Sequence, residues 1–148
     1  MRRMFLVLFV VFAVGNLGAA PPKRFAVGGG DQIYATGAKH FAISAHDGPQ
    51  GASGHVVFTQ QDPLFGDFTL SGHVRCVSVV GNSATIGVAI EHGTGTAEGQ
   101  PGILLVVTDN DGDAPDSLTN SGYLEVDENC PAPFDATTPI TSGNINIK

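Results

Sequence analysis

The chain has 148 residues, enough for one domain with its own hydrophobic core. Its acidic residues outnumber its basic residues, and the formal net charge is -7. Such a charge repels phosphate backbones, so we exclude nucleic acid as a partner. The same charge favours solubility and the attraction of cations or of a basic protein.

Residues 1–20 are typical of a signal peptide. Arg2 and Arg3 give a positive start, residues 4–15 form an uncharged apolar run, and small residues follow at 18–20. The run is shorter than the roughly 20 residues that a membrane helix needs, and no second run of that length follows. We therefore expect a protein that is secreted or held at the cell surface. Residues 21–148 would form a single domain that does not insert into a membrane.

Apolar and polar residues alternate along most of the remaining chain, which is the pattern of half-buried β-strands. Phe41 and Ile43 share one face of such a segment, and Val56 and Phe58 share one face of the next. Glycines and prolines divide the chain into short segments, as turns between strands require. Residues 103–107 are apolar at every position, which predicts a central strand covered on both faces.

This pattern predicts about seven to eight strands. Their ranges are 33–35 as a short edge strand, 40–45, 54–60, 67–80, 83–91, 103–107, 122–127 and 143–148. Short strands with turns between them predict an all-β fold, a single antiparallel β-sandwich or β-barrel. The pattern does not choose between these two architectures.

The clearest predicted hairpin turns after residue 80, where Gly81 and Asn82 are typical turn residues. A two-residue loop would set the apolar face of one strand beside the polar face of the other. A three-residue loop would place Cys76 opposite Val88 and keep the apolar faces together. The sequence therefore predicts the three-residue loop.

Cys76 and Cys130 are the two cysteines of the chain, and we expect them to form a disulfide in an oxidising compartment. In the chain-entropy model such a bridge restricts the unfolded chain by about 4 kcal/mol. The alternation places Cys76 on the apolar face of its strand with Val74, where a thiol would be buried and inert. The bridge would therefore be structural. It would hold a proline-rich segment, residues 128–142, that has no strand pattern.

Five stretches, spread over most of residues 21–148, form a recognisable set. They are HFAISAH at 40–46, GHVVF at 54–58, GHVRCVSVVGNSATI at 72–86, VTDN at 107–110 and SGNI at 142–145. In these stretches the chain resembles a family of secreted bacterial β-domains that includes the so-called post-COAP domain of large surface proteins. The resemblance implies an exported β-rich domain of unassigned activity, either free or appended to surface proteins. It carries over no catalytic residue.

The sharpest candidate site is an acidic turn that follows residue 108. Its carboxylates could converge on one hard cation, and calcium prefers six to eight oxygen ligands. These residues are Asp109, Asp111, Asp113 and Asp116. The turn departs from an EF-hand, because Ala114 stands at the glycine position and Asn120 at the position of the last glutamate. A solvated hairpin loop is the alternative, so the sequence predicts either no cofactor or calcium here.

Other chemistry-bearing residues give no catalytic set, and we predict no catalytic residue. If His55 and His73 lie opposite each other on neighbouring strands, their rings approach, but two ligands are too few for a zinc site. Residues 51–55 lack the final glycine and the following helix of a nucleophile elbow. Tryptophan is absent and only Tyr34 and Tyr123 represent tyrosine, so we expect no aromatic platform for sugars.

The sequence favours a non-enzymatic binding or structural domain whose partner is an extracellular protein or a glycan. A secreted enzyme, or an enzyme accessory domain that acts on extracellular polymers, is the alternative from another class. A protease inhibitor is a third possibility, with the glycine-rich segment 93–102 as its reactive loop.

Overall fold

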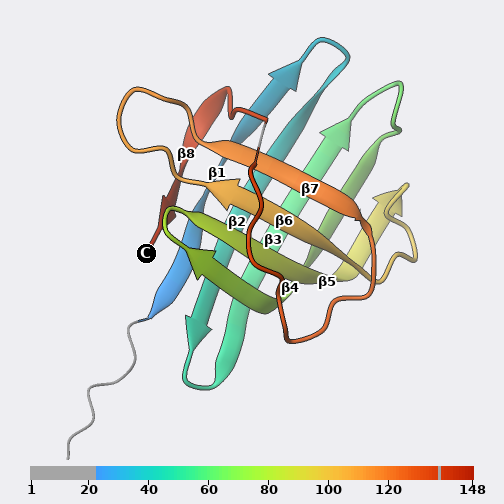
Figure 1. Cartoon of the computed structure of the whole chain (residues 1–148). Helices are drawn as coiled ribbons and strands as arrows, with labels where there is room; N and C mark the ends of the chain where they lie inside the picture. The colour runs from blue at the N-terminus through green and yellow to red at the C-terminus, as the bar shows by residue number, and fades with distance from the viewer. Residues whose placement is uncertain (1–22, 137) are drawn as a thin grey trace, which may run out of the picture.

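The computed structural model describes residues 23–136 and 138–148, so the predicted leader lies outside the described residues. The described chain forms one antiparallel sheet with the strand order β7-β6-β5-β4-β3-β2-β1-β8 (Figure 1). The strands are β1 (Arg24–Tyr34), β2 (Gly37–Gly48), β3 (Gly51–Gln61), β4 (Phe68–Val80), β5 (Ser83–Gly95), β6 (Gly102–Thr108), β7 (Ser117–Tyr123) and β8 (Ser142–Ile147). Within the described ranges, no helix is long and apolar enough to cross a membrane.

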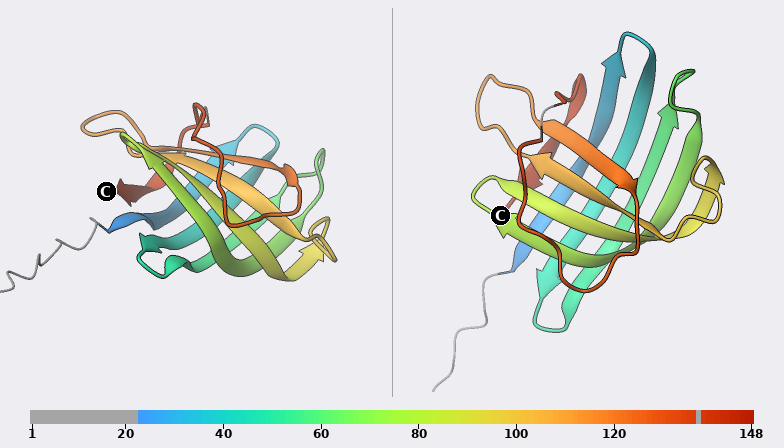
Figure 2. Two further views of the ribbon diagram at one scale, coloured as in Figure 1. Left: turned by 60° about the horizontal axis from the view of Figure 1, so that its bottom comes forward. Right: turned by 45° about the vertical axis from the view of Figure 1, so that its right-hand side comes forward.

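The sheet curls into a half-barrel, so that β5, β6 and β7 lie over β1, β2 and β3 (Figure 2). β4 and β5 bend most strongly and carry the chain from one layer to the other (Figure 1). Their ladder has two register shifts, one between Ser71 and Gly72 and one between Val74 and Cys76. Such β-bulges increase the local twist and bend of a strand. The bulges lie in the two strands at which the sheet bends from one layer to the other.

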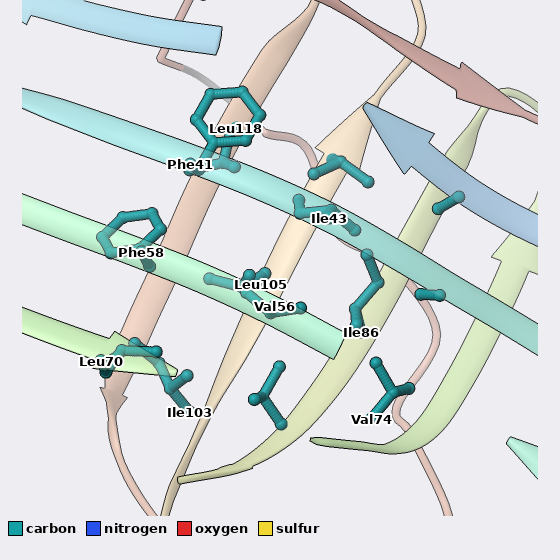
Figure 3. Close-up of a cluster of buried hydrophobic side chains, with 14 of the residues drawn as sticks. Phe41, Ile43, Val56, Phe58, Leu70, Val74, Ile86, Ile103, Leu105 and Leu118 are labelled. Carbon is teal, nitrogen blue, oxygen red and sulfur yellow. The ribbon is translucent and has the colours of Figure 1, made fainter. Parts of the chain in front are cut away.

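The apolar faces predicted from alternation fill the interior of the half-barrel. Phe41 and Ile43 of β2 and Val56 and Phe58 of β3 are buried, and Figure 3 shows them facing side chains of β6 such as Leu105. β6 is almost entirely buried on both faces, as its apolar run predicted. Burying one such side chain contributes about 1.5–3 kcal/mol. This core therefore holds the two layers together.

The β4–β5 hairpin has a two-residue loop, so the three-residue loop predicted from the sequence is wrong. Val80 pairs with Ser83, which leaves Gly81 and Asn82 as the turn. Gly81 has a φ of 61°, whereas the described non-glycine residues, Asn82 included, have no positive φ. A glycine with positive φ at the first turn position is what a type II′ hairpin turn needs.

The bulge at Arg75 restores the match between the apolar faces of this hairpin. Val74 pairs with Val88, and both side chains lie in the core. Cys76 pairs with Gly87, and the Cys76 side chain lies on the outer face of the sheet. One extra residue in β4 therefore inverts the alternation beyond it. The prediction that Cys76 shares the apolar face of Val74 is wrong for this reason, although Cys76 is buried.

Residues 124–136, here called the covering segment, cross the outer face of β5 and β6 (Figure 1). The predicted disulfide joins this segment to β4, with a Cα–Cα distance of 5.3 Å between Cys76 and Cys130. A Cβ on Gly87 would lie 2.5 Å from Cys76 Sγ and 2.6 Å from Val126. Only a glycine in β5 lets the covering segment pack this closely.

Two predicted strands differ from the structure. The expected edge strand 33–35 is the end of β1, which pairs with β2 on one side and with β8 on the other. Three glycines, 28–30, hide the alternation in the middle of β1. The expected strand 122–127 overlaps only the end of β7, because the chain leaves the sheet after Tyr123 to begin the covering segment. The polar residues of β7 gave no strand signal.

Candidate functional site

A cleft of about 410 Å³ lies where the ends of β1, β2 and β3 face β6 and β7. Its volume falls within the range of roughly 300–1,000 Å³ that is typical of ligand pockets. At this end the inner face of the sheet changes from apolar to polar and aromatic. The main side chains of its wall are Tyr34, Lys39, Phe65, Phe68, Asn120 and Tyr123.

Lys39 supplies the positive charge of the cleft. It alternates with Phe41 along β2, so its side chain points into the half-barrel. Lys39 Nζ donates a hydrogen bond of 2.8 Å to Asn120 Oδ1 and lies 5.8 Å from the centre of the Tyr34 ring. Among the described residues, no carboxylate lies within ion-pair distance of this nitrogen. Burial lowers the pKa of Lys39, and the charge of Asp62 offsets only part of that effect.

Asp62 holds the β3–β4 loop and the β1–β2 turn in place beside the cleft. Its buried carboxylate accepts hydrogen bonds from the N–H groups of Leu64 at 2.8 Å and Phe65 at 3.2 Å, and from the Thr36 hydroxyl at 3.2 Å. The Tyr34 hydroxyl also stabilises the charged carboxylate. Burial acts to raise the pKa of Asp62, but these donors outweigh it and hold the pKa below its usual range. Burial and the nearby carboxylate raise the pKa of Tyr34 to about 12.

Stacked aromatic rings form the apolar side of the cleft. The ring centres of Phe58 and Phe68 are 5.6 Å apart, and Phe68 meets Tyr123 edge-on at 6.0 Å. The Tyr123 hydroxyl lies 3.2 Å from Thr96 Oγ1. Phe65 stands at the rim and is 74% exposed. The cleft therefore has a rigid aromatic floor and an exposed aromatic edge.

Gln32 adds a buried amide to the same inner face, directly opposite Lys39 in the β1–β2 ladder. Its Nε2 donates to the carbonyl oxygens of Leu118 at 2.8 Å and Thr138 at 2.7 Å, which fixes the orientation of the amide. Its Oε1 is buried and has no hydrogen-bond partner among the described residues. A buried polar atom without a partner costs roughly 1–3 kcal/mol. This end of the interior therefore contributes less to stability than the rest of the core.

Two residues of the predicted calcium turn protect the edge of β8. Alternate N–H groups of this edge strand point away from β1 and need partners. Asp116 is buried and accepts hydrogen bonds from the N–H groups of Ile145 at 2.7 Å and Asn110 at 2.9 Å. Asp109 accepts one from the N–H of Ile147 at 3.2 Å. These carboxylates therefore link the β6–β7 turn to β8 without a β-ladder.

The other two residues of this turn, Asp111 and Asp113, are exposed. The turn and the start of β8 surround a polar hollow of about 390 Å³. In the part of the chain that the structure describes, no three His, Cys, Asp or Glu side chains are grouped as a metal ion requires. Calcium binding at Asp109, Asp111, Asp113 and Asp116 stays a prediction.

The histidines highlighted by the sequence lie on the outer face of the sheet. His55 and His73 stand opposite each other in the β3–β4 ladder, the pairing that would bring their rings together. Asp31 accepts a hydrogen bond of 2.7 Å from Ser142 Oγ and another from His40, and both hold its pKa below its usual range. The serine contacts the carboxylate and not the imidazole, so these groups do not form a nucleophile–base pair.

Two further candidate segments are absorbed into the sheet and its turns. Residues 51–55 form the start of β3. In the segment 93–102 the first three residues end β5, and tight turns follow, with hydrogen bonds of 3.2 Å from Ala97 N to Thr94 O and from Glu98 N to Gly95 O. Ala97 is fully buried. The segment is therefore folded against the sheet and does not project as an extended loop.

Sequence reasoning missed the cleft, although one signal pointed to it. Lys39 falls in the apolar phase of a strand, two residues before Phe41, where a charged residue is costly. Tyr34 and Tyr123 are too few for a flat aromatic platform, but the fold brings both to one concave site. The sequence indicated Asn120 only as the residue at the position where an EF-hand has its last glutamate.

Comparison of the chain with protein-family models, with curated proteins and with solved structures finds no match. The function of the cleft is therefore inferred from its own geometry and chemistry. The resemblance to the post-COAP domain stays a prediction.

Proposed function

We propose that this protein is a non-enzymatic binding domain, secreted or held at the cell surface, that recognises a glycan through the cleft around Lys39. The predicted leader and the Cys76–Cys130 disulfide support export, because such bridges persist in oxidising compartments. The cleft supports binding, because aromatic walls with a few convergent polar groups are typical of small-molecule sites.

The position of Lys39 is the observation that carries this proposal. Burying an ammonium group without a carboxylate partner is unfavourable, and an apolar side chain of similar length would pack better beside Phe41. Contact with a ligand explains why a residue that lowers stability is present inside a concave site. The surrounding amide and hydroxyl groups suit a hydroxylated ligand, and the rings of Tyr34 and Tyr123 suit the apolar faces of a sugar.

Intrinsic tyrosine fluorescence tests the proposal. The sequence has no tryptophan and two tyrosines, and both tyrosines line the cleft. We expect a saturable change in emission when the protein is titrated with at least one of three probes, the methyl glycosides of glucose, N-acetylglucosamine and glucuronic acid. A His55→Ala variant, changed on the outer face, should bind the same probe with unchanged affinity.

The proposal fails if none of the three probes gives a saturable change. It also fails if amide chemical-shift changes in nitrogen-15-labelled protein map away from the cleft. The measurement of chemical shifts places the probe independently of the tyrosines.

A further inference from the structure

We infer that the cleft selects a saccharide that carries a carboxylate, a uronic acid, whose carboxylate pairs with the Lys39 ammonium group. This inference rests on the proposed function and names the ligand class for the same cleft. Its basis is the charge of the cleft wall, the free donors of Lys39 and the limited depth of the cavity.

The cleft wall has the opposite charge to the protein as a whole. The chain has a formal net charge of -7, yet the side chains that line the cleft include one lysine and no aspartate or glutamate. Asp62, whose charge acts on Lys39, is not part of the cleft wall, and its carboxylate accepts hydrogen bonds from the N–H groups of Leu64 and Phe65. The positive charge of Lys39 is therefore not neutralised at the site and attracts an anion.

Lys39 has donors left for a ligand. An ammonium group has three N–H donors, and one of them is used by Asn120 Oδ1. Asn120 is neutral, so this bond holds the side chain in place without cancelling its charge. A ligand carboxylate can accept a charge-assisted hydrogen bond from the remaining donors, which is stronger than a bond between neutral groups.

The ligand should carry one negative charge and a short polar body. A single lysine, with no arginine in the cleft wall, suits a carboxylate better than a doubly charged phosphate. A fatty acid would need a long apolar channel, but Phe58, Phe68 and Ile103 fill the interior below the cleft. The amide and hydroxyl groups of Gln60, Asn120 and Thr138 in the wall instead match the hydroxyl groups of a sugar ring.

Two matched probes isolate the carboxylate. Methyl glucuronide and methyl glucoside differ only in a carboxylate that replaces a hydroxymethyl group, and cyclohexanecarboxylate keeps the ring and the charge but lacks the hydroxyl groups. In tyrosine-fluorescence titrations of the purified protein at neutral pH and low salt, we expect methyl glucuronide to bind at least tenfold more tightly than either of the other probes. Added salt should weaken its binding, because Lys39 remains partly accessible to solvent.

A change at Lys39 tests its role directly. Lys39→Met keeps the length of the side chain and should fold, because an apolar residue at a half-buried position is tolerated. We expect it to lose the tenfold preference for glucuronide, because its affinity for glucuronide should fall much more than its affinity for glucoside. Lys39→Arg should keep most of the preference, and Lys23→Met, which removes a charge before β1, should change nothing.

The outcomes separate this inference from the proposed function. Equal binding of glucoside and glucuronide to the original protein overturns the uronic acid assignment and leaves glycan binding in place. Equal binding of cyclohexanecarboxylate and glucuronide also overturns it, because the site would then read charge without the sugar. An unchanged preference in Lys39→Met overturns the role of Lys39. If no saccharide binds at all, the proposed function fails as well.

Discussion

Replacing Asp116 by alanine should destabilise the protein strongly, and should do so without any metal ion. The carboxylate accepts hydrogen bonds from the N–H groups of Ile145, at 2.7 Å, and Asn110, at 2.9 Å. Asp116 is 8% exposed, so water cannot fully replace these bonds when the side chain is removed. The variant would leave one backbone donor without this partner at the edge of β8 and a second one in the β6–β7 turn.

The size of the effect follows from these two bonds. A hydrogen bond to a charged group contributes about 1.5–3 kcal/mol, so the loss of both lowers the free energy of unfolding by roughly 3–6 kcal/mol. Asp111→Ala and Asp113→Ala are matched controls in the same turn. Their side chains are exposed, so each should change the free energy of unfolding by about 0.5 kcal/mol or less.

Urea unfolding followed by circular dichroism, in buffer with a calcium chelator, measures these differences. A second series with millimolar calcium separates the two interpretations of the turn. A loss of less than 1 kcal/mol for Asp116→Ala in chelator would refute the edge-protecting role. If the loss appears only in calcium, and the melting temperature of the original protein rises with calcium, the turn is a metal site.

Three further predictions concern the disulfide, the cleft and the outer face. In urea unfolding, the double variant Cys76→Ala, Cys130→Ala should have a free energy of unfolding about 4 kcal/mol lower than the original protein, and so should the reduced original protein. A difference under 1 kcal/mol would mean that other contacts hold the covering segment. Tyr34 should ionise near pH 12, so its contribution to stability is present below pH 10 and is lost as the pH rises through about 12. The phenolate absorbance of Tyr123→Phe measures this step, and ionisation near pH 10 in that variant would contradict it. Gly87→Ala should lower the free energy of unfolding by about 1–3 kcal/mol, because the added Cβ would lie 2.5 Å from Cys76 Sγ. Gly122→Ala is the control, because its Cβ would have no neighbour within 4 Å.

The sequence alone determined the strands that have one apolar and one polar face. Phe41 with Ile43 and Val56 with Phe58 point inward as alternation requires, because a strand packed on one side must keep a period of two. The apolar run of β6 likewise predicted burial on both faces. Two cysteines in a chain with a predicted leader indicated the disulfide from chemistry that needs no coordinates.

Only the tertiary structure decided the register of β4 and β5 and the site. The bulge at Arg75 inverts the faces within one strand, and a sequence pattern of period two cannot locate an extra residue. The cleft brings Tyr34, Lys39 and Asn120 together from β1, β2 and β7, which meet because the sheet curls. Asp116 likewise finds its partner in β8 far along the chain. Contacts between distant segments depend on the whole fold, and local pattern carries no record of them.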